Sequence, residues 1–199
     1  DLSGTHILTV PVGATLDVTE DSTGLTDVYT TQVAVEGENS TVSNTITIND
    51  VQNTAELIFT NTRKTAQITV VKQMLDETDE LSFPFTATLK NGSTPIEQYL
   101  VYTVTEGGNE IEHKTDRSGQ VPFELSHGQS QVLTVPAGAV LVLSETTNDY
   151  IADITFATGA SDADSEDNSF TLTVSGDDRI TFLNQPKGAS VLLRKIGYD

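Results

Sequence analysis

An internal repeat is the feature that most constrains what this chain can fold into. Residues 7–20 read ILTVPVGATLDVTE, and residues 132–145 read VLTVPAGAVLVLSE. Further pairs of residues keep a spacing of 123 to 125 positions: Glu20 and Glu145, Asn61 and Asn184, and Lys72 and Lys195. A fixed spacing indicates repeated structural modules, and this one is about the length of a small domain.

Apolar and polar residues alternate through most of the chain, and helical periodicity is nearly absent. The alternation predicts an all-β protein of short strands joined by tight turns. In the first part of the chain we expect strands at 7–10, 15–19, 30–35, 45–48 and 55–60. In the second part we expect strands at 67–73, 83–89, 99–105, 170–174 and 179–184.

The repeat also predicts how the chain divides. Residues 1–62 correspond to the C-terminal half of one domain, 63–66 to a linker, and 67–186 to a complete domain. Residues 187–199 correspond to a linker and the first strand of a following domain. We therefore interpret the chain as part of an array of domains whose ends are cut.

Composition excludes several kinds of partner. The formal net charge is -19, from 29 acidic and 10 basic residues, so nucleic acid and anionic membrane surfaces would be repelled. The absence of cysteine removes disulfides, thiol catalysis and cysteine-bound metals. No apolar run approaches the roughly 20 residues that span a bilayer, and no signal peptide is recognised. We expect neither a cofactor nor direct contact with a membrane.

Three polar residues continue otherwise apolar strand faces, because residues two apart in a strand share a face. Lys72 follows Ile68 and Val70, Glu145 follows Leu141 and Leu143, and Asn184 follows Ile180 and Phe182. Burying such groups unpaired costs several kcal/mol each. One interpretation satisfies all three: a neutral Lys72 amine attacks the Asn184 carboxamide, Glu145 moves the proton, and ammonia leaves. The alternative is that the three residues end their strands and reach solvent.

The set of residues resembles Cna-B-type domains, which stack as stalks in surface adhesins and pilins of Gram-positive bacteria. The similarity is carried by ITVVK at 68–72, FPFTATL at 83–89, GQVPFEL at 119–125, TVPAGA at 134–139, LSE at 143–145 and ITFLN at 180–184. Residues 1–62 match as a C-terminal half, through IFTNT at 58–62. The resemblance implies tandem Ig-like β-sandwich domains, the first incomplete. It also implies an intramolecular Lys–Asn isopeptide bond assisted by an acidic residue, here Lys72, Asn184 and Glu145.

The function implied is a structural stalk module at the bacterial cell wall, whose partners are neighbouring repeat domains and whose only chemistry is self-crosslinking. An alternative hypothesis is an adhesive domain that binds host matrix protein or glycan through the loops at 76–80 and 161–168. The clustered oxygens of Asp162, Asp164 and Asp167 form a weak candidate for a metal site.

The incomplete domain contains Glu20 and Asn61 but no lysine upstream of them. Lys195 lies on a segment similar to the strand that this half-domain lacks. This raises the hypothesis that chains complement one another head to tail.

Overall fold

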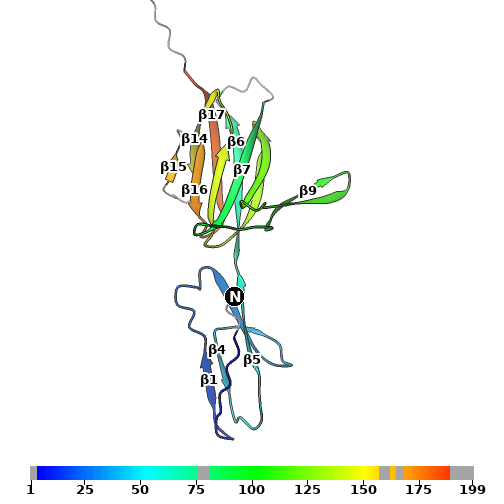
Figure 1. Cartoon of the computed structure of the whole chain (residues 1–199), viewed down its shortest axis with the longest axis vertical. Helices are drawn as coiled ribbons and strands as arrows, with labels where there is room; N and C mark the ends of the chain where they lie inside the picture. The colour runs from blue at the N-terminus through cyan, green and yellow to red at the C-terminus, as the bar shows by residue number, and fades with distance from the viewer. Residues whose placement is uncertain (1–3, 76–80, 157–161, 165–167, 189–199) are drawn as a thin grey trace, which may run out of the picture. The chain divides into compact units, whose positions relative to one another are not determined.

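The computed structural model describes residues 4–75, 81–156, 162–164 and 168–188. The chain divides into two compact units, Asp1–Lys64 and Thr65–Asp199, called the first and second unit below. Every element of regular secondary structure among the described residues is a β-strand, which confirms the all-β prediction (Figure 1). In this described part, no helix has the length and apolar character needed to cross a membrane.

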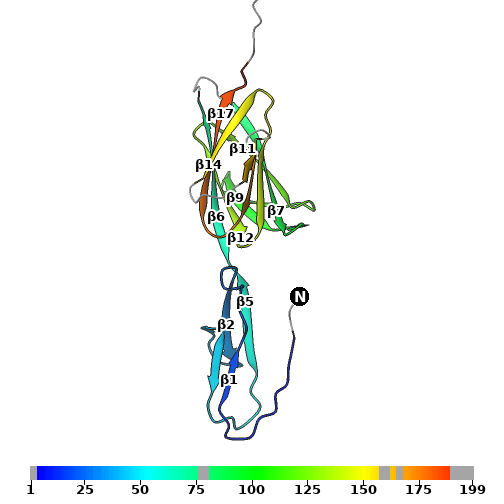
Figure 2. The same ribbon diagram turned by 90° about the vertical axis from the view of Figure 1, so that its left-hand side faces the viewer.

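The first unit contains two small antiparallel sheets (Figure 2). One pairs β1 (Leu16–Thr19) with β4 (Thr45–Ile48). The other has the order β3-β2-β5, formed by Thr41–Val42, Tyr29–Val35 and Leu57–Arg63. Among its described residues, Val33 is the only hydrophobic side chain that is fully buried. The first unit therefore has little hydrophobic core of its own.

The strand expected at 7–10 is absent, and that prediction is wrong. Ile7 and Leu8 are 91% and 66% exposed. Their counterparts in the repeat, Val132 and Leu133, belong to β12 (Ser130–Pro136), which pairs with β6 (Thr65–Met74). No described strand of the first unit corresponds to β6, so residues 7–10 have the β pattern without a partner.

The second unit has two larger sheets. The first has the order β11-β7-β13-β16-β15, and the short β8 pairs with β7. Its strands are β7 (Ser82–Asn91), β8 (Thr94–Pro95), β11 (Gln120–Ser126), β13 (Val140–Glu145), β15 (Asp162–Asp164) and β16 (Ser169–Thr173). A separate hairpin of β9 (Leu100–Glu106) and β10 (Asn109–Lys114) extends from the sandwich (Figure 1).

The second sheet of this unit has the order β12-β6-β17-β14, where β14 is Tyr150–Phe156 and β17 is Asp178–Pro186. The first and last strands, β6 and β17, are parallel neighbours at its centre. β5 ends at Arg63 and β6 begins at Thr65, so the segment 63–66 that the sequence predicts as a linker lies mostly in strands. These ends are fixed by pairing, since Arg63 lies opposite Tyr29 and Thr65 opposite Pro136.

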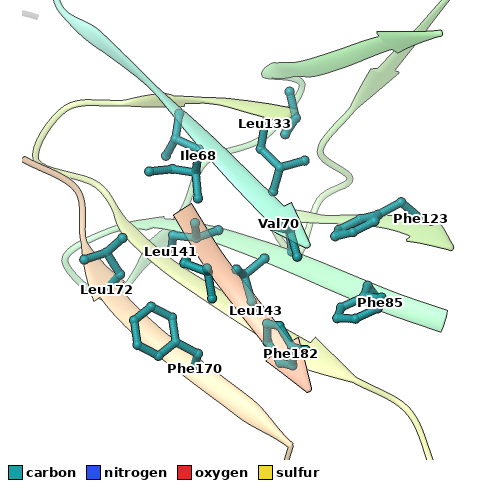
Figure 3. Packing of buried hydrophobic residues seen from close by; sticks show 14 of the residues in the cluster. Ile68, Val70, Phe85, Phe123, Leu133, Leu141, Leu143, Phe170, Leu172 and Phe182 are labelled. Atoms are coloured by element: carbon teal, nitrogen blue, oxygen red, sulfur yellow. The ribbon is translucent and has the colours of Figure 1, made fainter. Parts of the chain in front are cut away.

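The core of the second unit lies between its two sheets (Figure 3). Ile68 and Val70 from β6 and Leu141 and Leu143 from β13 are fully buried. The ring of Phe85 stacks on Phe123 with centroids 5.3 Å apart and meets Phe182 edge-on at 5.1 Å. The strand faces that lead to Lys72, Glu145 and Asn184 are therefore the faces that build this core.

Candidate functional site

Lys72, Glu145 and Asn184 meet inside the second unit. The Lys72 Nζ lies 3.1 Å from Glu145 Oε1, and Asn184 Nδ2 donates a hydrogen bond to the same oxygen at 2.9 Å. The three residues are 0%, 4% and 0% exposed. The structure thus brings together the three residues that the sequence singled out, and it buries them.

Strand pairing determines these positions. Lys72 lies opposite Phe182 in the parallel ladder of β6 and β17, and Asn184 lies two residues further along β17 on the same inward face. Glu145 is the last residue of β13 in the other sheet, which faces β6 and β17, and it pairs there with Phe85 of β7. The carboxyl group therefore reaches the amine and the carboxamide from across the core.

The surroundings of the amine are apolar apart from these partners and two backbone carbonyls. Lys72 Nζ donates to the carbonyl oxygen of Gln73 at 3.0 Å and lies 3.4 Å from that of Phe182. The Phe83 ring centroid lies 4.4 Å from Nζ. Because Lys72 is fully buried, bulk water does not solvate the amine.

Two polar atoms of the site have no partner. Glu145 Oε2 and Asn184 Oδ1 are buried without a hydrogen bond. Leaving such an atom unsatisfied costs about 1–3 kcal/mol, and buried polar groups in folded proteins are nearly always paired. While the side chains of Lys72 and Asn184 are not covalently joined, these two oxygen atoms therefore lack hydrogen bonds.

Burial shifts both titratable groups toward their neutral forms. Loss of solvation lowers the pKa of Lys72 below 10.5, and the charge and hydrogen bond of Glu145 oppose this. Loss of solvation raises the pKa of Glu145 above 4.5, against the charge of Lys72 and the hydrogen bonds from Lys72 and Asn184. A neutral amine is a nucleophile, and a protonated carboxyl can donate a hydrogen bond to a carbonyl.

Asn168 is a residue of this site that the sequence did not single out. Its carbonyl accepts from the Glu145 N–H at 2.9 Å, and its side-chain Oδ1 accepts from the Ala152 N–H at 2.7 Å. Ala152 lies directly opposite Asn184. Asn168 has a φ of 49° and is buried, so it connects the strand end that carries Glu145 to the strand beside Asn184.

A signal for Asn168 was present in the repeat. Asn44 lies 124 positions earlier, and its carbonyl accepts from the Glu20 N–H at 2.8 Å. The side chain of Asn44 differs from that of Asn168, because it donates to Ser22 Oγ and to the Glu20 carbonyl. The backbone half of the contact is thus repeated, and the side-chain half is not.

The first unit holds the corresponding acid and amide. Asn61 Nδ2 donates to Glu20 Oε1 at 2.6 Å, and the Thr31 hydroxyl donates to Asn61 Oδ1 at 2.6 Å. Asn61 is exposed to solvent, in contrast to Asn184.

The remaining residues named from the sequence fall wholly or partly outside the described part. Lys195 and Asp167 lie outside it, and for Asp162 and Asp164 only the backbone, in β15, is described. Among the described residues, no group of three or more His, Cys, Asp or Glu side chains could hold a metal ion.

A family model described as "Domain of unknown function (DUF7601)" matches residues 66–185. The matched segment contains Lys72, Glu145 and Asn184. A search of the curated proteins returned no match.

Solved structures show similarity of fold. The chain is 19% identical to the major pilin protein T-13 of Streptococcus pyogenes, with a TM-score of 0.56 over 91% of this chain and 70% of that one. A variant of the major pilin from Streptococcus pyogenes is 19% identical to this chain and has a TM-score of 0.54. The match covers 89% of this chain and 72% of that one. A pilus-presented adhesin, Spy0125 (Cpa), is 23% identical and has a TM-score of 0.44. That match covers 60% of this chain and 27% of the adhesin. The two pilins confirm the predicted β-sandwich fold class.

Proposed function

This chain belongs to the DUF7601 family, and we propose that its second unit is a stalk module of a bacterial surface protein, held by a Lys72–Asn184 isopeptide bond. One observation carries the proposal. A single oxygen, Glu145 Oε1, lies within hydrogen-bond distance of both the amine that would attack and the amide nitrogen that would leave. A proton can therefore pass between the two nitrogens through one atom.

The reaction begins from the neutral amine and the protonated carboxyl. The lone pair of Lys72 Nζ attacks Cγ of Asn184, and the electron pair of the C=O π bond moves to Oδ1. Positioning supplies much of the rate, because effective molarities of well-oriented groups reach on the order of 10⁵ M or more.

The second half of the reaction transfers protons and releases ammonia. Through Oε1, which lies within hydrogen-bond distance of both nitrogens, Glu145 gives its proton to Nδ2 and takes one from the attacking nitrogen. The Cγ–Nδ2 bond breaks as the carbonyl reforms, and ammonia leaves. One amine and one primary amide thus become one secondary amide and ammonia, and Glu145 ends in its starting protonation state.

The product would satisfy the atoms that lack partners. The new amide N–H can donate to one oxygen of Glu145, while the protonated second oxygen donates to the Asn184 carbonyl. A non-covalent ion pair leaves both Glu145 Oε2 and Asn184 Oδ1 unpaired in an apolar core, where desolvation of charge is costly. The pairing of these atoms favours the crosslink over a permanent ion pair.

The stalk role is supported by the fold shared with pilins and by the position of the two crosslinked strands. Lys72 lies on the first strand of the second unit and Asn184 on the last, so tension between the two ends of the unit would pass through the amide. We propose that the protein is displayed on the bacterial surface and that neighbouring domains of the same polypeptide are its partners.

The alternative of an adhesive domain has no observation in its favour here. The loop at 76–80 lies outside the described residues, and so do 161 and 165–167 of the second loop.

The test is the mass of the intact, fully denatured protein. We expect the wild-type chain to be one ammonia lighter than its sequence mass, and a proteolytic digest to contain a branched peptide joining Lys72 to Asn184. Glu145→Gln and Asn184→Ala should each restore the full mass. A wild-type chain at its full sequence mass would remove the crosslink from the proposal.

A further inference from the structure

The turn between β11 and β12, residues 126–129, holds the backbone of Lys72. The Lys72 N–H donates to the Gln129 carbonyl at 3.0 Å, and the Lys72 carbonyl accepts from the Gly128 N–H at 2.9 Å. β12 itself begins only at Ser130. The turn therefore continues the pairing of β6 past the start of β12, at the residue that carries the amine.

One side chain of this turn reaches two residues further along β6. The Met74 N–H donates to Nδ1 of the His127 ring at 3.0 Å. A ring nitrogen accepts a hydrogen bond only when it carries no proton, so the proton of the neutral imidazole lies on Nε2. The ring thus takes the place that a main-chain carbonyl would have in the ladder, and it holds the end of β6.

The hydrogen bond to His127 acts on the Lys72 amine through a single peptide group. The N–H of Met74 and the carbonyl of Gln73 belong to the same peptide group, which is planar, and in a trans peptide the two bonds point in opposite directions. Lys72 Nζ donates to this Gln73 carbonyl at 3.0 Å. Fixing the N–H on one side therefore fixes the carbonyl on the other side, and with it the position of the amine.

The contacts of the amine show what this carbonyl contributes. Nζ lies 3.0 Å from the Gln73 carbonyl and 3.1 Å from Glu145 Oε1, against 3.4 Å from the Phe182 carbonyl. A neutral amine has two N–H bonds and one lone pair, so donation to the two nearer oxygens leaves the lone pair for Cγ of Asn184. A peptide group turned away from Nζ would remove one of these two contacts.

We propose that His127 is a positioning residue for the crosslinking reaction. Its Nδ1 holds the peptide group between Gln73 and Met74, and the carbonyl of that group orients the Lys72 amine for attack. Hydrogen bonds in a chain polarise one another, so the bond to His127 also makes the Gln73 carbonyl a stronger acceptor. This inference rests on the proposed function, because it concerns the same reaction.

The test compares two replacements of similar size at position 127. His127→Asn places an acceptor oxygen, Oδ1, on the same carbon that carries Nδ1, whereas His127→Leu places a methyl group there. Crosslinking is followed as the loss of one ammonia over time after cell-free synthesis. We expect the rate to stay within about threefold of wild type in His127→Asn and to fall about tenfold or more in His127→Leu. Because His127 is exposed, neither change removes a core side chain, and circular dichroism shows whether each variant is folded.

Gln129 provides a matched control in the same turn. Its side-chain Oε1 accepts from the Ser126 N–H at 2.8 Å, so Gln129→Leu removes one hydrogen bond of the turn and leaves the peptide group between residues 73 and 74 in place. We expect Gln129→Leu to crosslink at the wild-type rate. A general loosening of the turn would instead slow Gln129→Leu and His127→Leu alike.

Three results overturn the inference: a folded His127→Leu chain that crosslinks at the wild-type rate, a folded His127→Asn chain that is as slow as His127→Leu, or a Gln129→Leu chain that is equally slow. Where His127→Leu does not fold, His127→Ala, which also lacks the acceptor, takes its place in the comparison. A wild-type chain at its full sequence mass is a different result, and it overturns the proposed function together with this inference.

Discussion

Replacing both titratable residues of the candidate site, Lys72 and Glu145, with uncharged residues of similar volume isolates the effect of the crosslink on stability. In the double variant Lys72→Met/Glu145→Gln, the amine and the acid are removed together, so no unpaired charge is left in the core. Volume-conserving changes of this kind usually cost less than about 1.5 kcal/mol. Any larger loss of stability therefore reports the missing covalent bond.

The expected loss follows from the length of the loop that the bond closes. Lys72 and Asn184 are 112 positions apart, and a crosslink over about 110 residues removes enough entropy from the unfolded chain to stabilise the fold by about 5 kcal/mol. A unit of about 120 residues has an unfolding entropy of about 0.25 kcal/mol per kelvin. The double variant should therefore melt about 20 °C below the wild type.

Differential scanning calorimetry of the wild type and the double variant measures this difference, and the intact mass of each sample shows which one carries the bond. The matched control is Glu145→Asp, which keeps an acid at the site and allows the remaining fraction of crosslinked protein to be related to its melting temperature. The reasoning is refuted when the wild type lacks one ammonia and the double variant still melts within about 5 °C of it.

Three further predictions concern protonation, backbone strain and positioning. In Glu145→Gln the free energy of unfolding should rise with pH toward 10.5, because the folded-state pKa of Lys72 lies below that value and the unfolded chain binds the extra proton. In Lys72→Met the free energy of unfolding should fall as pH rises above 4.5, because the folded-state pKa of Glu145 lies above 4.5 and the folded chain binds the extra proton. Urea titrations across pH measure both slopes, and slopes of the same sign would contradict the assignment. Gly119→Ala should lower the free energy of unfolding by about 2 kcal/mol, since Gly119 has a φ of +74° and an added Cβ would lie 2.5 Å from a backbone carbonyl oxygen. Gly176→Ala, which points into open space, should change it by less than about 0.5 kcal/mol in the same urea titration. Asn168→Ala should slow crosslinking by roughly tenfold or more, as measured by the loss of mass over time after cell-free synthesis. Asn168→Asp keeps the acceptor oxygen and should crosslink faster than the alanine variant. Equal rates in wild type and Asn168→Ala would argue against a positioning role.

Alternation of residues was sufficient to predict which faces of the strands point inward. Ile68 and Val70 lead to Lys72, and Ile180 and Phe182 lead to Asn184, so the direction of each polar side chain follows from counting by two. The repeat added the order of the elements. Neither source determines which strands become neighbours across the core, and the contact of Glu145 with the other two residues depends on that.

The errors have identifiable physical causes. Residues 7–10 have the same pattern as a paired strand, but a strand needs a partner for its backbone groups, and the described first unit offers none. Strand alternation does not identify Asn168, because its role depends on a left-handed backbone conformation and on hydrogen bonds to two different strands. The repeat carries only the backbone half of this role, through Asn44, and the side-chain half depends on the tertiary fold.

The parallel pairing of β6 and β17 has a consequence for damage to the protein. The chain enters the second unit at the start of β6 and leaves at the end of β17, and these points lie at opposite ends of the central strand pair. With the Lys72–Asn184 amide in place, the shortest covalent route through the unit omits residues 73–183. A protease that cut once anywhere in that stretch, including the exposed turn of the β9–β10 hairpin, would leave the two ends of the protein joined.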